Sequence, residues 1–373
     1  MSGLTIRRES SLQDIDWLEW NGLLDSMQEP LVFMSPEYCD ACWASYQKDC
    51  ELILLTCWQE DQMVGVAPFM LVPNSRGGGV RLITSYRGDY SDLVCKDGSA
   101  VVARALLLAV WEASAGHSVW LDSIPESSNS LEMIKKLRHE KRCYPIKRAT
   151  NPSSSLVYDG NESRATRMKS LKPQRNYFLN LGDYQVRHLL NPAEIHPLLD
   201  AFFEQHVTRW SGSESPSLFR FEENREIYRR LVDTLGPRGW LLFSVVEGGG
   251  SVLAYHFGFQ FNHKLIYYKP TYNVAWATRS PGMILLKELF LYTFEKDFDE
   301  FDFSVGDDGY KGRFTNSNKQ NFTYELSSNR YQWIKYLMRA HSPFLARIIG
   351  SLEAIKLVGL YAYIVNKLSI GKR

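Results

Sequence analysis

Long hydrophobic runs and abundant cysteine are both missing from this sequence. No stretch approaches the roughly 20 consecutive apolar residues that a membrane-spanning helix requires, and the N-terminal segment Met1–Trp17 lacks the apolar core of a secretory signal. The six cysteines are scattered over 373 residues, which is not the density of a disulfide scaffold and is typical of a reducing compartment. These absences predict a cytoplasmic protein.

An excess of one charge sign is missing too. The chain has 43 lysine and arginine residues against 42 aspartate and glutamate residues, a formal net charge of +1, so it carries no overall electrostatic footprint for nucleic acid. It has no Gly-x-Ser-x-Gly elbow and no Walker loop, and the Cys-x-x-Cys pair Cys39 and Cys42 has no second pair at ligand spacing. We therefore expect no hydrolase, no NTPase and no metal site.

What the sequence has is a globular composition that suits two domains. Hydrophobic residues make up 45% of the chain and aromatic residues 13%, and 373 residues exceed one ordinary core. In the second half, apolar periodicity and turn residues predict two helices, three antiparallel strands, a helix and two further strands. Their expected ranges are 191–207, 222–235, 240–247, 252–261, 264–270, 281–296, 301–305 and 321–326.

The first half repeats part of this order, which indicates a duplication. Strands are expected at 52–59, 64–73 and 80–86, a helix at 99–115 and a strand at 118–124, in which Asp122 takes the place that Asp302 has in the second half. We predict an α/β (α+β) protein with mixed, mostly antiparallel sheets flanked by helices. The expected divisions are residues 1–150, residues 151–330 and a basic helical segment, 331–373, that packs on the core or, alternatively, lies on the inner face of a membrane.

The stretch FDFSVGDDGYKGRF, residues 301–314, carries the candidate chemistry. It begins as a strand with its phenylalanines and valine on one face and Asp302 and Ser304 on the other. A turn of two aspartates and two glycines follows, before Tyr310 and Lys311. We interpret it as a strand that ends at the lip of a ligand cleft, the alternative being an ordinary surface loop.

A second candidate lies in the strand 252–261. Alternation puts Ala254, His256, Gly258 and Gln260 on one face, and these small or polar residues are typical of a strand that floors a cleft. A histidine there can act as a base near neutral pH, although a lone histidine on a strand is more often structural.

Several segments together resemble a known family. In chain order they are SPEYCDACWASY, GVAPFMLVP, GDYSDLV, SRATRMKSLKPQR, FFEQHVTRW, LAYHFGF, YKPTYN, SPGMILL and FDFSVGDDGYKGRF. The set resembles the CelD-type acetyltransferase-like proteins of exopolysaccharide and cellulose biosynthesis, within the GNAT fold. It is also similar to the FemAB/FemX aminoacyltransferases, which are tandem GNAT-like domains. The resemblance covers most of the chain and implies two duplicated GNAT-like domains, of which the first lacks the tyrosine-lysine loop and is expected to be degenerate.

The resemblance also implies site residues. Tyr310 and Lys311 match the aromatic-lysine pair of FemAB-like enzymes, whose lysine offsets negative charge at the reacting centre, and Asp302 or His256 is then the expected base. The start of the helix at 281 stands where GNAT domains carry a Gln/Arg-x-x-Gly-x-Gly/Ala run for the pyrophosphate of coenzyme A; Pro281 departs from that run and removes one N–H donor. The expected donor-binding residues are Arg279, Ser280, Gly282 and Met283, and the expected substrate-binding residues are Arg209, Trp210, Tyr268, Asp307, Arg167 and Lys169.

The reaction expected from this resemblance is acyl transfer from acyl-CoA, without a metal. The acceptor is expected to be an amino or hydroxyl group of a sugar or sugar nucleotide in envelope or exopolysaccharide biosynthesis. Two alternatives stay open. One is a FemAB-like transferase that uses aminoacyl-tRNA on a peptidoglycan precursor, and the other is a non-catalytic subunit of a polysaccharide synthase that docks through 331–373.

Overall fold

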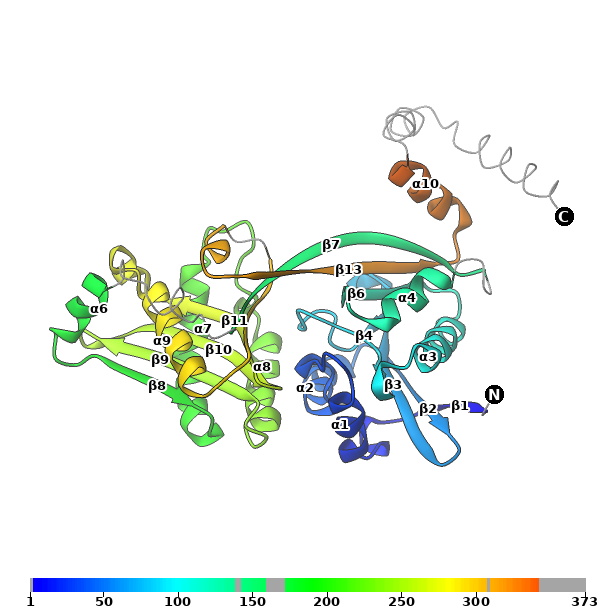
Figure 1. Cartoon of the computed structure of the whole chain (residues 1–373), viewed down its shortest axis with the longest axis horizontal. Coiled ribbons are helices and arrows are strands. Elements are labelled where there is room, and N and C mark those ends of the chain that lie inside the picture. The colour runs from blue at the N-terminus through cyan, green and yellow to red at the C-terminus, as the bar shows by residue number, and fades with distance from the viewer. Residues whose placement is uncertain (1–2, 138–141, 159–171, 307–308, 342–373) are drawn as a thin grey trace.

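The computed structural model of the protein describes residues 3–137, 142–158, 172–306 and 309–341. They form two lobes that share one continuous sheet of 13 strands (Figure 1). The strands are β1 (Leu4–Glu9), β2 (Glu51–Gln59), β3 (Gln62–Val72), β4 (Gly79–Leu82), β5 (Val94–Cys95), β6 (Val119–Pro125), β7 (Tyr144–Val157), β8 (Gln185–Leu189), β9 (Leu241–Gly248), β10 (Ser251–Phe261), β11 (Lys264–Tyr272), β12 (Glu300–Val305) and β13 (Ser317–Ser327). Their order across the sheet is β1-β2-β3-β4-β6-β13-β7-β12-β11-β10-β9-β8, and β5 pairs with β3.

Helices flank this sheet in both lobes, which confirms the predicted α/β class with a mixed, mostly antiparallel sheet. The helices are α1 (Trp17–Asp25), α2 (Pro36–Tyr46), α3 (Ala100–Ala113), α4 (Asn129–Lys136), α6 (Lys172–Leu179), α7 (Pro192–Arg209), α8 (Glu222–Leu235), α9 (Pro281–Glu295) and α10 (Arg330–His341). The structure differs from the expectation in one respect, because the two units share a single sheet instead of having one each.

In the second lobe, helices cover opposite faces of the same strands. Phe257 of β10 contacts Phe202 of α7 and Tyr228 of α8, whereas Leu265 of β11 lies in a separate core with Leu285 of α9. Since successive side chains of a strand point to opposite faces, the near-continuous apolar runs of β9 to β11 fill both cores. The second lobe is therefore a sandwich of one sheet between two helical layers.

Two long strands, β7 and β13, connect the lobes (Figure 1). β13 pairs along its whole length with residues Tyr144–Ser155 of β7, and β7 pairs with β12 only over Ser153–Val157. Pro145 and Pro152 are therefore tolerated in β7, because a proline removes a ladder bond and is confined to edges and irregular positions. The predicted division at residue 150 falls within β7 and stays a prediction.

In each lobe, two neighbouring parallel strands pair with each other over only two or three residues. Among the described residues, β11 and β12 pair from Lys264↔Glu300 to Ile266↔Asp302, and β4 and β6 pair at Val80↔Val119 and Arg81↔Trp120. Beyond these residues β11 continues toward Tyr272 while β12 turns to pair with β7. The sheet thus opens between β11 and β12, directly after Asp302.

The predicted C-terminal helical segment is described only in part. Its beginning forms α10, and residues 342–373 lie outside the described residues. Across the described ranges, no helix combines the length and the apolar character that a bilayer crossing needs. Contact of 331–373 with a membrane stays a prediction, which vesicle flotation of the chain with and without 342–373 tests.

A glycine in β3 allows α3 to approach the sheet closely. A β-carbon at Gly65 would lie 2.5 Å from Cγ1 of Val102 and 3.0 Å from Cδ1 of Leu106. We expect Gly65→Ala to lower the free energy of unfolding by about 1–3 kcal/mol, because overpacking forces neighbouring side chains to shift. Chemical denaturation measures this effect.

Gly22 provides the matched control for that prediction. It lies in α1, and a β-carbon there would meet nothing within 4 Å. Gly22→Ala should therefore stabilise the protein by up to about 1 kcal/mol, since alanine is the better helix former. Equal effects of the two substitutions would contradict the close packing of α3 on β3.

Candidate active site

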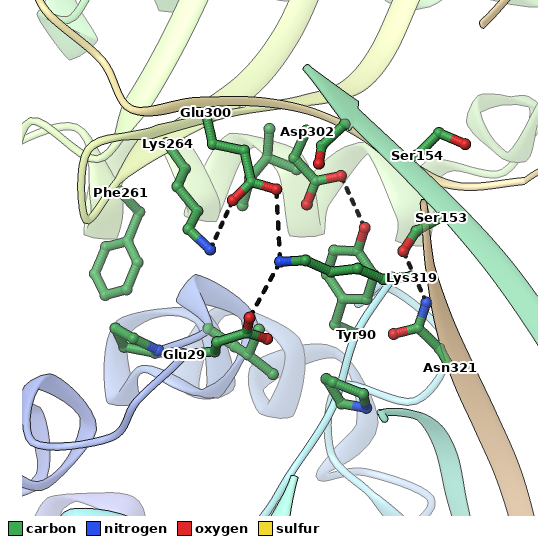
Figure 2. Close-up of a pocket in the computed structure, with 15 residues that line it drawn as sticks. Glu29, Tyr90, Ser153, Ser154, Phe261, Lys264, Glu300, Asp302, Lys319 and Asn321 are labelled. Carbon is green, nitrogen blue, oxygen red and sulfur yellow. Dashed lines mark hydrogen bonds and ion pairs between the residues drawn. The ribbon is translucent and has the colours of Figure 1, made fainter. Parts of the chain in front are cut away.

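A small pocket lies between the lobes at the point where β11 and β12 begin (Figure 2). It encloses about 40 Å³, enough for the reacting tip of a ligand but not for a whole sugar. Its walls come from both lobes and from the β7–β13 connection. The lining residues are Glu29, Pro30, Leu31, Tyr90, Pro125, Ser153, Ser154, Ser155, Phe261, Lys264, Ile266, Glu300, Asp302, Lys319 and Asn321.

A chain of ion pairs crosses the pocket (Figure 2). Glu300 of β12 lies 2.9 Å from Nζ of Lys264 and 3.6 Å from Nζ of Lys319, and Lys319 in turn lies 3.1 Å from Glu29 of the first lobe. Burial opposes ionisation of Glu300, but Lys264 beside it brings the pKa of that carboxyl below its ordinary value. These ion pairs tie β12 to the first lobe through β13.

Among the three carboxyl groups that line this pocket, those of Glu29, Glu300 and Asp302, only that of Asp302 has a raised pKa. Its Oδ1 accepts hydrogen bonds from the Tyr90 hydroxyl at 2.9 Å and from the backbone N–H of Ser304 at 2.7 Å. Burial, and next the negative charge of Glu300, raise the pKa of Asp302 to about 6. A carboxylate with such a pKa is largely ionised at pH 7 yet basic enough to accept a proton from a reacting group.

The backbone leaves regular strand geometry immediately after Asp302. Ser304 has φ +63°, and the register of β12 against β7 shifts between Asp302 and Val305. A positive φ at a residue other than glycine is uncommon and costs energy, which the surroundings must offset. Here the Ser304 hydroxyl donates to the carboxylate of Asp89, which the first lobe supplies. The first lobe therefore holds the bend of β12 in place.

The predicted catalytic residues Lys311 and Tyr310 lie at the far end of this bend. Lys311 is 5% exposed, and its Nζ donates to the carbonyl of Gly306 at 3.2 Å. The ring of Tyr310 lies 6.5 Å from that of Phe303, on the α9 side of the sheet. Both residues follow the strand that carries Asp302, but neither lines the small pocket. Their catalytic roles stay predictions.

His256 lies on the face of β10 that α9 covers. It is fully buried, its ring stacks on that of Tyr267 at 5.1 Å, and the backbone N–H of Tyr268 donates to its Nε2 at 3.4 Å. Burial, and next the nearby His188, lower the pKa of His256 to about 3. The face that was expected to floor a cleft is therefore filled by a helix, and His256 does not line the pocket that contains Asp302.

The predicted donor-binding residues lie together at the start of α9. Ser280 caps the helix with φ +53° and without a side-chain hydrogen bond, and Met283 packs at the edge of the α9 core. The Arg279 guanidinium lies 3.9 Å from the centre of the Tyr177 ring. A β-carbon at Gly282 would lie 3.1 Å from Cδ1 of Tyr272, so glycine suits this close approach to β11. A helix start flanked by an arginine suits the phosphates of a donor, although Pro281 contributes no N–H.

The predicted substrate-binding residues that the structure describes surround the end of β11. Nη1 of Arg209 donates to the carbonyl of Pro270 at 2.9 Å, and the guanidinium lies 4.3 Å from the Tyr272 ring. Trp210 follows at the C-cap of α7. Tyr268 is buried, and its hydroxyl donates to the backbone carbonyl of Arg87. The remaining three residues, Asp307, Arg167 and Lys169, lie outside the described residues.

Sequence reasoning missed most of the residues that surround Asp302. Tyr90 and Asp89 come from the loop after β4, within the segment GDYSDLV that contributed to the family resemblance, so a signal was available for them. Glu29, Lys264 and Lys319 carried no such signal, because isolated charged residues in three separate segments do not form a pattern. In the part of the chain that the structure describes, no group of three or more His, Cys, Asp or Glu residues is arranged to hold a metal.

The first lobe contains a counterpart of Asp302 in a different setting. Asp122 of β6 forms an ion pair with Arg81 of β4 at 3.2 Å. Burial raises the pKa of Asp122, and Arg81 limits that rise. A carboxylate held by an arginine is a poorer proton acceptor than Asp302, whose hydrogen-bond partners are uncharged.

Comparison with known proteins agrees with this geometry. Residues 165–312, which include Asp302 and Lys311, match the family of acetyltransferase (GNAT) domains. No curated protein sequence matches the chain.

Solved structures with the same fold extend the likeness to both lobes. FemX is 10% identical over 83% of this chain and 96% of its own, with a TM-score of 0.56. The C-terminal domain of a protein described as a putative lysylphosphatidylglycerol synthetase, from Agrobacterium fabrum, is 10% identical over 88% of this chain and 96% of its own, with a TM-score of 0.55.

A third solved structure is described as a tandem GNAT protein. The tandem GNAT protein of the clavulanic acid biosynthesis pathway is 12% identical over 88% of this chain and 99% of its own, with a TM-score of 0.51. At these identities the likeness concerns the fold, which is that of a tandem GNAT protein. The GNAT domain match at residues 165–312 supports an acyltransferase.

Proposed function

We propose that the protein transfers an acyl group from acyl-CoA to an amino or hydroxyl group of a sugar or sugar nucleotide in envelope or exopolysaccharide biosynthesis. The observation that carries this proposal is the position of Asp302. It is a partly buried carboxyl with a pKa of about 6, it lines an interlobe pocket, and it lies where β11 and β12 separate. The acceptor reaches the reacting centre through this pocket.

Asp302 acts as the base in this proposal. The acceptor nitrogen or oxygen attacks the thioester carbonyl carbon and passes its proton to the Asp302 carboxylate. The carbon–sulfur bond then breaks, and coenzyme A leaves as a thiolate that takes up a proton. The Tyr90 hydroxyl, 2.9 Å from Asp302, holds the carboxylate in position.

Lys311 and the start of α9 serve the donor. The ammonium group of Lys311 offsets the negative charge that develops on the carbonyl oxygen in the transition state. Arg279 and the backbone around Gly282 bind the donor phosphates through charge and helix N–H groups. GNAT domains use acyl-CoA as donor, and the domain match at residues 165–312 includes all of these residues.

The polar lining of the pocket supports a hydroxyl-rich acceptor. Ser153, Ser154, Ser155 and Asn321 line it beside the charged residues, and the Asn321 amide donates to Ser153 Oγ at 3.0 Å. Hydroxyl and amide groups exchange hydrogen bonds readily with the hydroxyls of a sugar. The acceptor's reacting group and its nearest hydroxyls are therefore the parts recognised in the pocket.

Calorimetric titration with acetyl-CoA and longer acyl-CoA tests the donor. We expect micromolar binding that Arg279→Ala weakens by about tenfold, the loss of a charge-assisted phosphate contact. Arg220→Ala, at an exposed arginine in the turn before α8, is the matched control and should leave binding unchanged. Absence of binding to every acyl-CoA would reject this donor.

A second donor, aminoacyl-tRNA, is favoured by one observation. The first residue of α9 is Pro281, which has no N–H, and the neighbouring Arg279 stacks on Tyr177, so this helix start has fewer free donors than a standard pyrophosphate site. This donor would give RNA binding with a steep salt dependence, measured by filter binding across a salt series. Acyl-CoA turnover without RNA binding would exclude it.

A further inference from the structure

A second, larger cavity lies between the lobes on the other side of the loop that carries Tyr90. It encloses about 200 Å³, and its walls come from the end of α2, from β3, from the loop after β4 and from the start of α8. It shares no lining residue with the pocket at Asp302. The lining residues are Ser45, Tyr46, Cys50, Val72, Tyr86, Arg87, Glu223, Asn224 and Ile227.

Arg87 is the basic residue in the wall of this cavity. Its Nη2 donates to Oδ1 of Asn224 and its Nη1 to the carbonyl of Tyr86 at 2.6 Å, while its Nε is buried without a hydrogen-bond partner among the described residues. None of the described carboxylates lies within ion-pair distance of it. Withdrawing a guanidinium from water without an opposite charge is costly, and an anion in the cavity would offset that cost.

Tyr46 contributes a buried hydroxyl group to the wall of the cavity. It is 8% exposed, and its hydroxyl is buried without a hydrogen-bond partner among the described residues. Burial is the main cause that raises the pKa of Tyr46. The charge of Arg87 lowers this pKa, so the two side chains lie close enough to interact. A single ligand oxygen bound at Arg87 can therefore also accept a hydrogen bond from Tyr46.

The rest of the lining restricts the ligand further. Val72, Ile227 and the Tyr86 ring form an apolar wall beside Arg87. Glu223 is exposed and remains hydrated, so its negative charge offsets the positive charge of Arg87 only weakly. The lining thus suits one anionic group attached to a small apolar body.

We propose that this cavity is a binding site for a small organic anion, a carboxylate or a phosphate monoester with an apolar body, held by Arg87 and Tyr46. The site adjoins the acyl-transfer pocket through one loop. The carbonyl of Arg87 accepts hydrogen bonds from Tyr38 and Tyr268, and the same loop supplies Asp89 to Ser304 and Tyr90 to Asp302. Anion binding at Arg87 stabilises the loop that positions Asp302.

Two pairs of probes test the proposal on the full chain. Benzoate and benzamide have the same shape and differ in charge, and phenyl phosphate and phenol differ in the same way. We expect benzoate or phenyl phosphate to raise the melting temperature and to bind at least about tenfold more tightly than its neutral counterpart in calorimetry. The stronger of the two anions identifies the ligand class. Equal affinity for charged and neutral probes, or no binding of any probe, would overturn the proposal.

Two variants locate the binding. Arg87→Gln should weaken binding of the anion at least about tenfold, whereas Arg220→Gln, which removes the same charge from the exposed turn before α8, should not change it. Tyr46→Phe remains informative if Arg87→Gln fails to fold. It should keep or raise the melting temperature of the free protein, because it removes a buried hydroxyl without a partner, and it should weaken anion binding. Unchanged affinity in Tyr46→Phe, or equal losses in Arg87→Gln and Arg220→Gln, would place the anion elsewhere.

Discussion

Replacing Asp302 by asparagine should lower kcat/KM for acyl transfer by about a hundredfold or more, the usual contribution of a general base. The substitution is nearly isosteric, and the side-chain amide oxygen of the variant can still accept hydrogen bonds from Tyr90 and from the N–H of Ser304. The loss would therefore reflect the missing proton acceptor and not a rearranged pocket. Steady-state kinetics across a pH series measures it, and wild-type activity should rise as the pH passes through about 6.

The same substitution should stabilise the fold at neutral pH. Folding raises the pKa of Asp302 from 3.8 to about 6, so the folded state favours the protonated carboxyl. Its stabilising contribution is complete below 3.8 and is lost as the pH rises through about 6. Above that pH the ionised carboxylate costs on the order of 3 kcal/mol relative to the unfolded chain. Asparagine avoids this cost, so the variant should melt at a higher temperature than wild type at about pH 8, and the difference should shrink toward about pH 4.

Asp122→Asn in the first lobe is the matched control. It removes a partly buried carboxyl from the corresponding strand, but that carboxyl is paired with Arg81. We expect catalysis to change by less than about threefold, because Asp122 does not line the pocket at Asp302. Stability should rise less than in Asp302→Asn, because Arg81 offsets part of the cost of burying the Asp122 charge. Retention of more than about a tenth of wild-type activity by Asp302→Asn would mean that Asp302 is not the base.

Local sequence signals were sufficient for most of the second lobe. The helices α7 and α9 begin within one residue of their predicted starts, and Asn191 caps α7 by accepting from the N–H of Ala193 at 3.0 Å. The strands β9 to β11 lie within one or two residues of their expected ranges. These elements have strong caps, short turns and clear periodicity, so the information that determines them is local.

The connection between the lobes was not predictable in this way. The sequence of β7, YPIKRATNPSSSLV, contains two prolines and three serines, which argue against a strand. It is a strand because β13, far along the chain, pairs with it from Tyr144 to Ser155. Tertiary pairing overrode local propensity, so the continuity of one sheet through both lobes was not predictable from local signals.

The candidate site shows the same limit. Alternation placed Ala254 and His256 on the same face of β10, but it does not say that helices cover both faces of the strand, so the burial of His256 under α9 was not foreseen. Likewise, Asp302 was recognised on its strand face, while its hydrogen-bond partner Tyr90 and the pocket residue Glu29 belong to the other lobe. The lining of this pocket comes from segments spread between residues 29 and 321, so only the three-dimensional arrangement reveals it.

Replacing Lys311 by methionine should lower kcat by more than about tenfold with little change in acyl-CoA affinity. Loss of one group that stabilises a developing oxyanion costs at least this much, and the effect falls on the transition state and not on the bound donor. Methionine keeps most of the apolar stem, which matters because Lys311 is 5% exposed and a smaller residue would leave a cavity. Burst kinetics together with calorimetry separates the chemical step from donor binding.

Arg313→Met provides the control for position and charge. Arg313 ends the same short turn, Lys311–Arg313, but it is exposed, so its loss should leave kcat within about twofold. The ammonium of Lys311 donates to Gly306 at the end of the bend that begins at Asp302, so a purely structural role predicts a different result. In that case Lys311→Met would lower the melting temperature and shift the pKa that the pH–rate profile assigns to Asp302. A tenfold loss of kcat with both of these unchanged is the result that only charge stabilisation at the reacting centre explains.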